Sequence, residues 1–237
     1  MNLTRQRVAL AGLAAAGLLL TGCGSSLGIH PGSAVVIGDQ SVGMARIDTA
    51  ATLFCKVYVT QSQAQASSQQ SGPIPMGLVR NYAASSLAKR ALGEQLAAQY
   101  AVTPASGYQQ AISQYQSALA SSPADQRDAA IEVAGADAYL ENVQVAIGQK
   151  LSGKTGSSNA ELKAALQGGQ VATQDWLTHH SAFIDPVFGV AVDGGKFSTV
   201  KDQTSYPLSA LASAGAQTTA APGDAYTSQL SSSQLCQ

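Results

Sequence analysis

The sequence predicts a mainly helical fold with a small β component, for three reasons. Apolar side chains recur every three or four residues over most of the chain between Ile47 and Leu177, as in amphipathic helices. Two short runs of β-forming residues, each folded about a Gly-Asp or Asp-Gly turn, flank this part and predict two hairpins. Only 11% of the residues are charged, so we expect alanine-packed helices joined by polar, uncharged loops.

The first hairpin is predicted at Ala34–Val42, and a helix over Ile47–Val59 follows it. The Gln- and Ser-rich segment Gln61–Gly72 should then form an exposed loop. Pro75 suits the first turn of the next helix. Its apolar stripe consists of Leu78, Tyr82, Leu92, Leu96 and Tyr100.

Proline after a capping residue marks the starts of the next two helices. Thr103-Pro104 starts a short helix, and Ser122-Pro123 starts a longer one that should extend to Leu151. The apolar face of the short helix consists of Tyr108, Ile112, Tyr115 and Leu119.

The last long helix is predicted at Ala160–His180, with Ser158 and Glu161 as a capping box at its start. Gly168-Gly169 lies inside this helix and would cost about 2 kcal/mol relative to two alanines. We therefore expect a kink or a break at these two glycines.

Beyond this helix, a second hairpin is predicted from Val187–Val192 and Phe197–Val200. Residues 209–237 should form a low-complexity tail that ends in a cysteine. Within this tail, we expect Ser209–Gly223 to be irregular and Ala225–Leu235 to contain a short helix.

The N-terminal segment has the pattern of an export signal. Arg5 and Arg7 precede an apolar run from Val8 to Leu20, and small residues follow the run. A helix of this length would measure about 20 Å, which is too short to cross a hydrocarbon core about 30 Å thick. The segment is therefore expected to be removed rather than kept as a membrane span.

Leu20-Thr21-Gly22-Cys23 resembles the lipobox of bacterial lipoproteins. The resemblance implies that residues 1–22 are the signal peptide, that Cys23 carries the lipid, and that residues 23–33 are a tether. The protein should then be held at the extracytoplasmic face of the cell membrane, on its periplasmic or extracellular side. The alternative is an ordinary secreted protein in which Cys23 merely lies near the cleavage site.

The charge balance argues against nucleic acid as a partner. Residues 1–22 hold two of the 13 basic residues and no acidic residue, so 11 basic and 14 acidic side chains remain, a net charge of −3. No basic cluster follows Cys23, so the membrane should be bound through lipid and not through charge.

Two cysteines remain in the mature chain, Cys55 and Cys236. An exported chain meets an oxidising environment, in which an even pair of cysteines indicates a disulfide. The alternative is a pair of free thiols, with Cys55 buried in a helix and Cys236 on a frayed tail. Neither cysteine has a second ligand at a zinc-binding spacing, so no metal site is expected.

Motifs for catalysis and for cofactor binding are missing from the sequence. There is no credible Ser-His-Asp order, no Walker loop and no G-x-G-x-x-G. His179-His180 is the one histidine cluster, but adjacent helical positions point about 100° apart and do not ligate one metal together. We therefore expect a protein without a cofactor, and a solvated helix end at the two histidines.

Ser33–Tyr58, a hairpin that leads into an amphipathic helix, resembles the N-terminal chaperone module of the SurA/PrsA family, and the order of the following helices agrees. The whole chain is similar to small actinobacterial lipoproteins that have this module without the parvulin isomerase domain. The resemblance implies a helical domain over residues 34–208, completed by helix Ala160–His180 and strand Val187–Val192.

This family fold sets three expectations for the structure. The hairpin Ala34–Val42 should pair with, or lie beside, the late strand Val187–Val192. Helix Ala160–His180 should pack close to helix Ile47–Val59 and bury Trp176 or Leu177 near Phe54. Tyr82–Leu151 should then form a helical arm.

The leading functional hypothesis is a non-catalytic holdase that binds unfolded or extended exported polypeptides. Tyr82, Tyr108, Tyr115 and Leu119 are the candidate lining of its client groove, although core positions are equally expected from their spacing. The alternative is a structural or interaction lipoprotein with one specific envelope partner. A broad groove would favour the first, and a compact patch the second. An enzyme, either a reduced isomerase or a metal-dependent hydrolase with a pocket near His179 or His180, is the third hypothesis.

Overall fold

The computed structural model describes residues 31–64, 72–193, 196–200, 208–217 and 224–237. The chain divides into two compact units, Met1–Gly32 and Ser33–Gln237. The export signal, the lipobox and Cys23 lie outside the described residues. The second unit is mainly helical with a few short antiparallel strands, and this confirms the predicted fold class.

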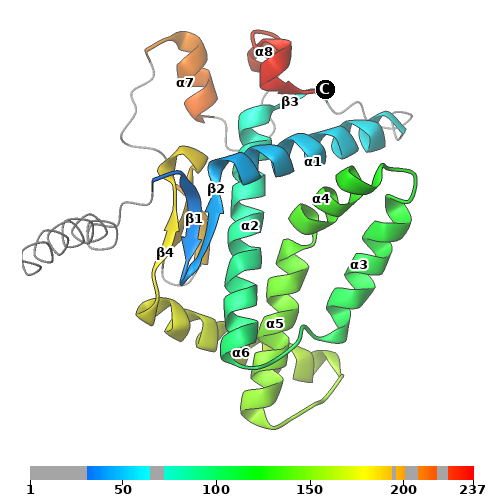
Figure 1. Cartoon of the computed structure of the whole chain (residues 1–237), viewed down its shortest axis with the longest axis vertical. Helices are drawn as coiled ribbons and strands as arrows, with labels where there is room; N and C mark the ends of the chain where they lie inside the picture. Colours follow the sequence, from blue (N-terminus) through cyan, green and yellow to red (C-terminus); the bar gives the residue numbers. More distant parts are fainter. Residues whose placement is uncertain (1–30, 65–71, 194–195, 201–207, 218–223) are drawn as a thin grey trace, which may run out of the picture. The chain divides into compact units, whose positions relative to one another are not determined.

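A three-stranded antiparallel sheet forms where the first hairpin was predicted (Figure 1). Strands β1 (Ser33–Ile37) and β2 (Gln40–Gly43) are the two arms of the hairpin, and β4 (Ala182–Ile184) pairs with the other edge of β1. A hairpin alone is marginal in water, and β4 supplies the third strand that stabilises it.

The strand predicted to complete the hairpin, Val187–Val192, was placed wrongly. Asp185 caps a 3₁₀ turn at η1 (Pro186–Phe188) by accepting a hydrogen bond from the Val187 amide at 3.0 Å, so an extended strand begins only afterwards. Strand β5 (Val190–Asp193) then pairs with β6 (Lys196–Thr199) in a sheet of its own. The second hairpin is thus present, but it starts later than predicted.

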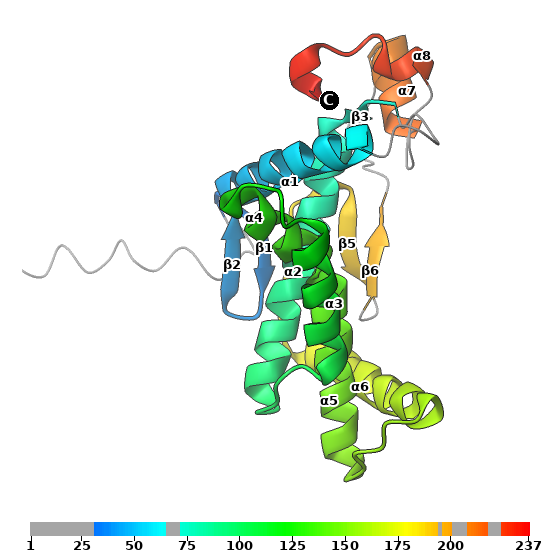
Figure 2. The ribbon, with the colours of Figure 1, turned by 90° about the vertical axis from the view of Figure 1, so that its right-hand side faces the viewer.

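Helix α2 (Met76–Gln99) lies at the centre of the core and not in an arm. It contacts α1 (Met44–Ala64), β1 and α5 (Ala136–Ser152), as Figures 1 and 2 show. Small side chains on several sides of α2 allow these close contacts. Its buried apolar residues are Val79, Ala83, Ala84, Leu87, Ala88, Ala91, Leu92 and Leu96.

The helix predicted from Ser122 to Leu151 is two helices in the structure. Helix α4 (Ala124–Ala134) ends at Gly135, and α5 begins at the next residue. α4 turns to contact α1, whereas α5 continues along α2. A Cβ atom at residue 135 would lie 2.6 Å from the Ile131 carbonyl oxygen and 3.1 Å from Ile112, so the turn requires glycine.

Helix α6 (Asn159–His179) runs without a break and packs along α5, not along α1 as expected. The predicted capping box is present, with Ser158 and Glu161 bonded to each other's backbone N–H. The glycines that were expected to break the helix serve close packing instead. A Cβ atom at Gly169 would overlap the carbonyl oxygen of Gln144 on α5.

Trp176 does not lie near Phe54, since α6 is turned towards the first hairpin. A Cβ atom at Gly38 in the hairpin turn would lie 3.1 Å from the Trp176 ring, which is 4% exposed. Phe54 of α1 packs instead against Tyr82 of α2, with 5.4 Å between ring centroids.

The C-terminal segment belongs to the same compact unit as the rest of the body. Helix α7 (Ala210–Gln217) lies where irregular chain was predicted, and α8 (Asp224–Thr227) follows it. A short turn, η2 (Ser232–Gln234), then leads into β7 (Leu235–Cys236). Strand β7 pairs with β3 (Ile74–Pro75), which directly precedes α2.

The start of the predicted loop Gln61–Gly72 is helical instead, because α1 continues to Ala64. Residues 65–71 lie outside the described part of the chain. The predicted start of the third helix also shifts: α3 (Ser106–Ala118) begins after an extended Ala105, two residues beyond Thr103.

Candidate functional site

The four residues proposed to line one client groove do not share one surface. Leu119 is only 8% exposed and packs with Val57 and Ala130 in a small core cluster between α1 and α4. Tyr108 lies at the start of α3, where its ring meets Tyr139 of α5 edge to face, with 5.1 Å between centroids. Leu119 and Tyr108 therefore pack within the protein.

Arg90 of α2 explains the position of Tyr108. Its guanidinium donates to the Tyr108 hydroxyl at 2.9 Å and to Glu94 at 2.7 Å, and it lies 3.7 Å from the Tyr139 ring centroid. Burial alone would lower the pKa of Arg90, but the bonds to Glu94 and Tyr108 outweigh burial and raise it. Arg90 thus stays charged and ties α3 to α2 and α5. No pattern in the sequence indicated this cluster.

Tyr82 and Tyr115, the other two candidates, both remain partly exposed. Tyr82 is 41% exposed and rests against Phe54, while the half-buried Tyr115 donates from its hydroxyl to the Ala134 carbonyl at 3.4 Å. Phe54 of α1 and Tyr82 of α2 are thus in ring contact, and the phenol of Tyr115 on α3 contributes to the raised pKa of Tyr82. We call these three residues the aromatic site.

The electrostatic setting of the aromatic site keeps the Tyr82 phenol protonated. Burial raises the pKa of Tyr82, and the carboxylate of Asp137 and the phenol of Tyr115 raise it further, against a lowering by a hydrogen bond with Ser86. Asp137 is itself paired with Lys89 at 2.6 Å. The site therefore presents a neutral aromatic ring with a polar O–H group.

Helix α3 is packed only loosely against the body, where it contacts α4 and α5. None of its residues is fully buried, and its apolar side chains Tyr108, Ile112 and Tyr115 are all half-buried. Two contacts hold its start against Asn142 of α5: the Ala105 amide donates to the Asn142 carbonyl at 3.1 Å, and Gly107 allows the Asn142 side chain to approach. The tie at Arg90 and these contacts position the helix.

A shallow depression lies elsewhere, at the C-terminal ends of α2 and α5. The ammonium group of Lys150 there donates to the carbonyl oxygens of Tyr100 and Ala101, at 2.7 and 3.4 Å. Lys150 thus satisfies carbonyls at the end of α2, where a cation is favourable. The lining of the depression consists of Ala101, Val102, Thr103, Ala146, Gln149, Lys150, Gly153 and Thr155.

The two histidines at the end of α6 bond to their own helix. Nδ1 of His179 lies 2.8 Å from the Asp175 carbonyl oxygen, and Nδ1 of His180 lies 2.8 Å from that of Trp176. The His180 ring also stacks on the Trp176 ring, with 4.0 Å between centroids. Within the described residues, no group of three His, Cys, Asp or Glu side chains is placed to hold a metal ion.

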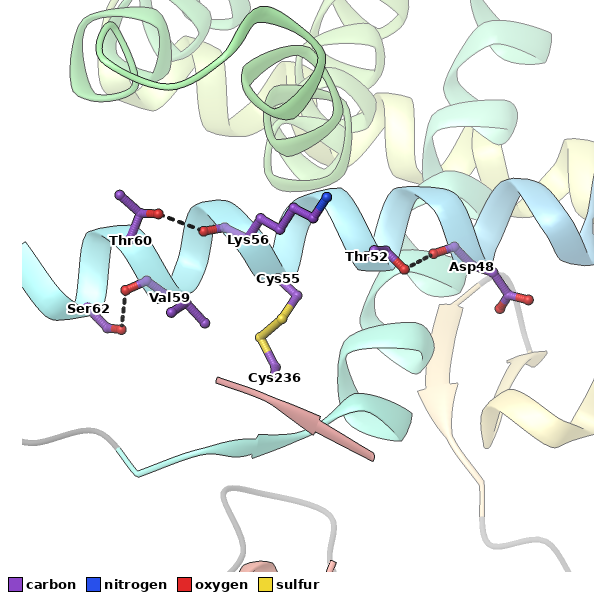
Figure 3. The surroundings of a disulfide bond; sticks show 8 residues. All are labelled: Asp48, Thr52, Cys55, Lys56, Val59, Thr60, Ser62 and Cys236. Carbon is purple, nitrogen blue, oxygen red and sulfur yellow. Dashed lines mark hydrogen bonds between the residues drawn. A yellow bond between two sulfur atoms is a disulfide. The ribbon is translucent and has the colours of Figure 1, made fainter. Parts of the chain in front are cut away.

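Cys55 and Cys236 are joined by a disulfide, with their Cα atoms 5.6 Å apart. Figure 3 shows that Cys55 lies on the side of α1 that faces β7, while Lys56 points away from it. The disulfide links residues 181 positions apart and fixes the C-terminus to the first helix.

Comparison of the chain with family models, with curated proteins and with solved structures finds no match. No helix in the described part of the chain is both long and apolar enough to cross a bilayer.

Phe54 belongs to the aromatic site and the carboxylate of Asp137 raises the pKa of Tyr82, but neither residue was among the predicted site residues. Phe54 is partly buried and packs against both core clusters. Asp137 belongs to no sequence motif. The turn at Gly135 brings it next to α2, where it pairs with Lys89.

Proposed function

We propose that this chain is a non-catalytic binding protein of the bacterial cell envelope, anchored by lipid on Cys23 at the extracytoplasmic face of the membrane. The lipobox Leu20–Cys23, after a basic and an apolar segment, supports the anchor and the location. The exposed ring of Tyr82 supports binding and carries this proposal.

The partner that suits the aromatic site best is a polypeptide. Tyrosine supplies a large apolar ring with a polar tip, and it is enriched among the residues that dominate protein interfaces. Tyr82 has a rigid base for this role, because Ala83 and Ser86 beside it on α2 are buried. Its protonated hydroxyl can donate to a backbone carbonyl of the partner.

The size of the aromatic site favours one specific envelope partner over many clients. Tyr108 and Leu119 are engaged by their own neighbours, which leaves a compact patch around Tyr82. A compact patch with one prominent aromatic side chain is typical of recognition of a defined surface.

A holdase for unfolded or extended exported chains is the second candidate. The loosely packed helix α3 favours it, since displacement of a helix without buried residues would expose apolar surface of α4 and α5. The resemblance of Ser33–Tyr58 to the SurA/PrsA chaperone module motivates the same candidate.

The two candidates and the site can be tested together with purified mature protein. Its binding to native envelope proteins and its suppression of aggregation of an unfolded exported protein are measured in parallel. We expect the wild-type protein to show one of these two activities, and Tyr82→Ala to weaken it by about tenfold or more, as the loss of an interface anchor does.

The matched control is Val171→Ala, which truncates an apolar side chain that is 66% exposed on α6. It should leave both activities at the wild-type level. Tyr82→Phe keeps the ring and should lose less than Tyr82→Ala. Equal activity of Tyr82→Ala and wild-type protein in both assays would refute the assignment of the site.

A further inference from the structure

The C-terminal residues 224–237, which we call the strap, return to the body at one place. β7 and η2 contact β3, α1 and α2, whereas α8 packs on α7. In this packing the Tyr226 hydroxyl lies against Gly215 of α7, so close that a side chain there would have to displace it. The strap is thus attached to the body mainly through its last few residues.

The strand ladder at this attachment is short. The ladder between β3 and β7 consists of two residue pairs, Ile74 with Cys236 and Pro75 with Leu235. Pro75 has no N–H to donate to the ladder. Leu235 is only half-buried, and η2 is held by bonds within itself, between Ser231 and Gln234.

The disulfide is the strongest element of this attachment. Ordering a chain end costs conformational entropy for each residue, and a two-residue strand offers little to offset it. The disulfide closes the contact covalently, with Cys55 and Cys236 only 7% and 2% exposed. The core around α2 and the sheet β2-β1-β4 are formed by other residues.

We propose that the disulfide Cys55–Cys236 is a redox latch, whose reduction releases the strap while the body stays folded. In this step a dithiol reductant attacks the disulfide, is itself oxidised to a disulfide, and passes two electrons and two protons to Cys55 and Cys236, which become thiols. Release opens the edge of β3 and exposes Cys55 on the face of α1 that the strap covers.

The latch is distinct from the aromatic site, so its test does not depend on the proposed function. Hydrogen exchange is followed by mass spectrometry in the exported full chain, oxidised and after reduction with dithiothreitol. Peptides from residues 224–237 should exchange about tenfold faster or more in the reduced protein, and peptides from α2 should keep their protection.

Trp176 reports on the body in the same samples, because it is the one tryptophan of the chain and is buried beside the first hairpin. Its emission should not change on reduction. Cys236→Ser, without reductant, should reproduce the fast exchange of the strap.

Two results would overturn the latch. One is unchanged protection of residues 224–237 in the reduced protein. The other is loss of protection in α2 together with a shift of Trp176 emission, since this would mean that reduction unfolds the whole body.

Discussion

Tyr82 differs in solvent exposure from the side chains around it on α2. Val79, Ala83 and Ser86, which surround it on α2, are buried in the core, yet 41% of the Tyr82 surface remains exposed. Its spacing fitted a core stripe, and sequence reasoning alone could not separate a core position from a surface one. The structure separates them because Phe54 packs against the ring without covering it.

Membrane attachment is predicted to depend on Cys23. Cys23→Ser should remove the lipid and leave the protein in the soluble fraction, because stable anchoring needs the acyl chains that the cysteine carries. Cell fractionation followed by immunoblotting measures this. Cys236→Ser is the matched control, since it removes a cysteine without touching the lipobox, and it should stay with the membrane. Membrane recovery of Cys23→Ser at the wild-type level would show that the anchor lies elsewhere.

The packing of α5 against α6 shows why the break expected at Gly168-Gly169 does not occur. Gly168-Gly169 is unfavourable in an isolated helix, and a break was the reasonable expectation. In the structure, Gly148 on α5 and Gly169 on α6 remove the side chains that would keep the two backbones apart. The packing gained between the helices outweighs the local cost of glycine, and this gain depends on a partner helix that local sequence does not specify.

The same pair gives a stability prediction with an internal control. A Cβ atom at Gly148 would overlap the carbonyl of Ala165, so Gly148→Ala should lower the free energy of unfolding by about 1–3 kcal/mol. A Cβ atom at Gly168 meets only the Gly148 Cα at 3.6 Å, so Gly168→Ala should be neutral or stabilise by up to about 1 kcal/mol.

Urea unfolding followed by Trp176 fluorescence and circular dichroism measures both variants. The order of midpoints should be Gly168→Ala at or above wild type, and Gly148→Ala clearly below it. If Gly148→Ala unfolds at the wild-type midpoint, α5 and α6 do not pack as described.

Elements with strong local signals were predicted well, and those set by distant partners were not. Val35-Val36-Ile37 before Gly38-Asp39 predicted the first hairpin, and Ser158 with Glu161 predicted the start of α6. β4 has only three residues, too few to show a strand period, and it exists because β1 offers it an edge. The turn at Gly135 likewise depends on α4 reaching α1.

In the whole molecule, contacts between distant parts of the chain close the body. β1 pairs with β4 about 145 residues later, and Cys55 bonds to Cys236 near the end of the chain. The expectation that early and late elements meet was correct, but the strand that meets the hairpin and the helix that packs on α6 were predicted wrongly.

A lipid on Cys23 would limit where the body can act. Nine residues lie between Cys23 and Ser33, the first residue of β1, and the ten Cα–Cα steps from Cys23 to Ser33 span at most about 35 Å. If Cys23 carries lipid, as we propose, the aromatic site works within reach of proteins at the membrane surface.

Site-specific photo-crosslinking in cells tests the central claim most directly. A photoreactive amino acid replaces Tyr82 in the exported protein, and the same amino acid replaces Val171 in a matched control. On irradiation, position 82 should form an adduct with another protein, as a discrete band for one partner or as many bands for a holdase, while position 171 should form none. The absence of any adduct from position 82, or the same adducts from both positions, would contradict the proposal that the aromatic site is a binding surface.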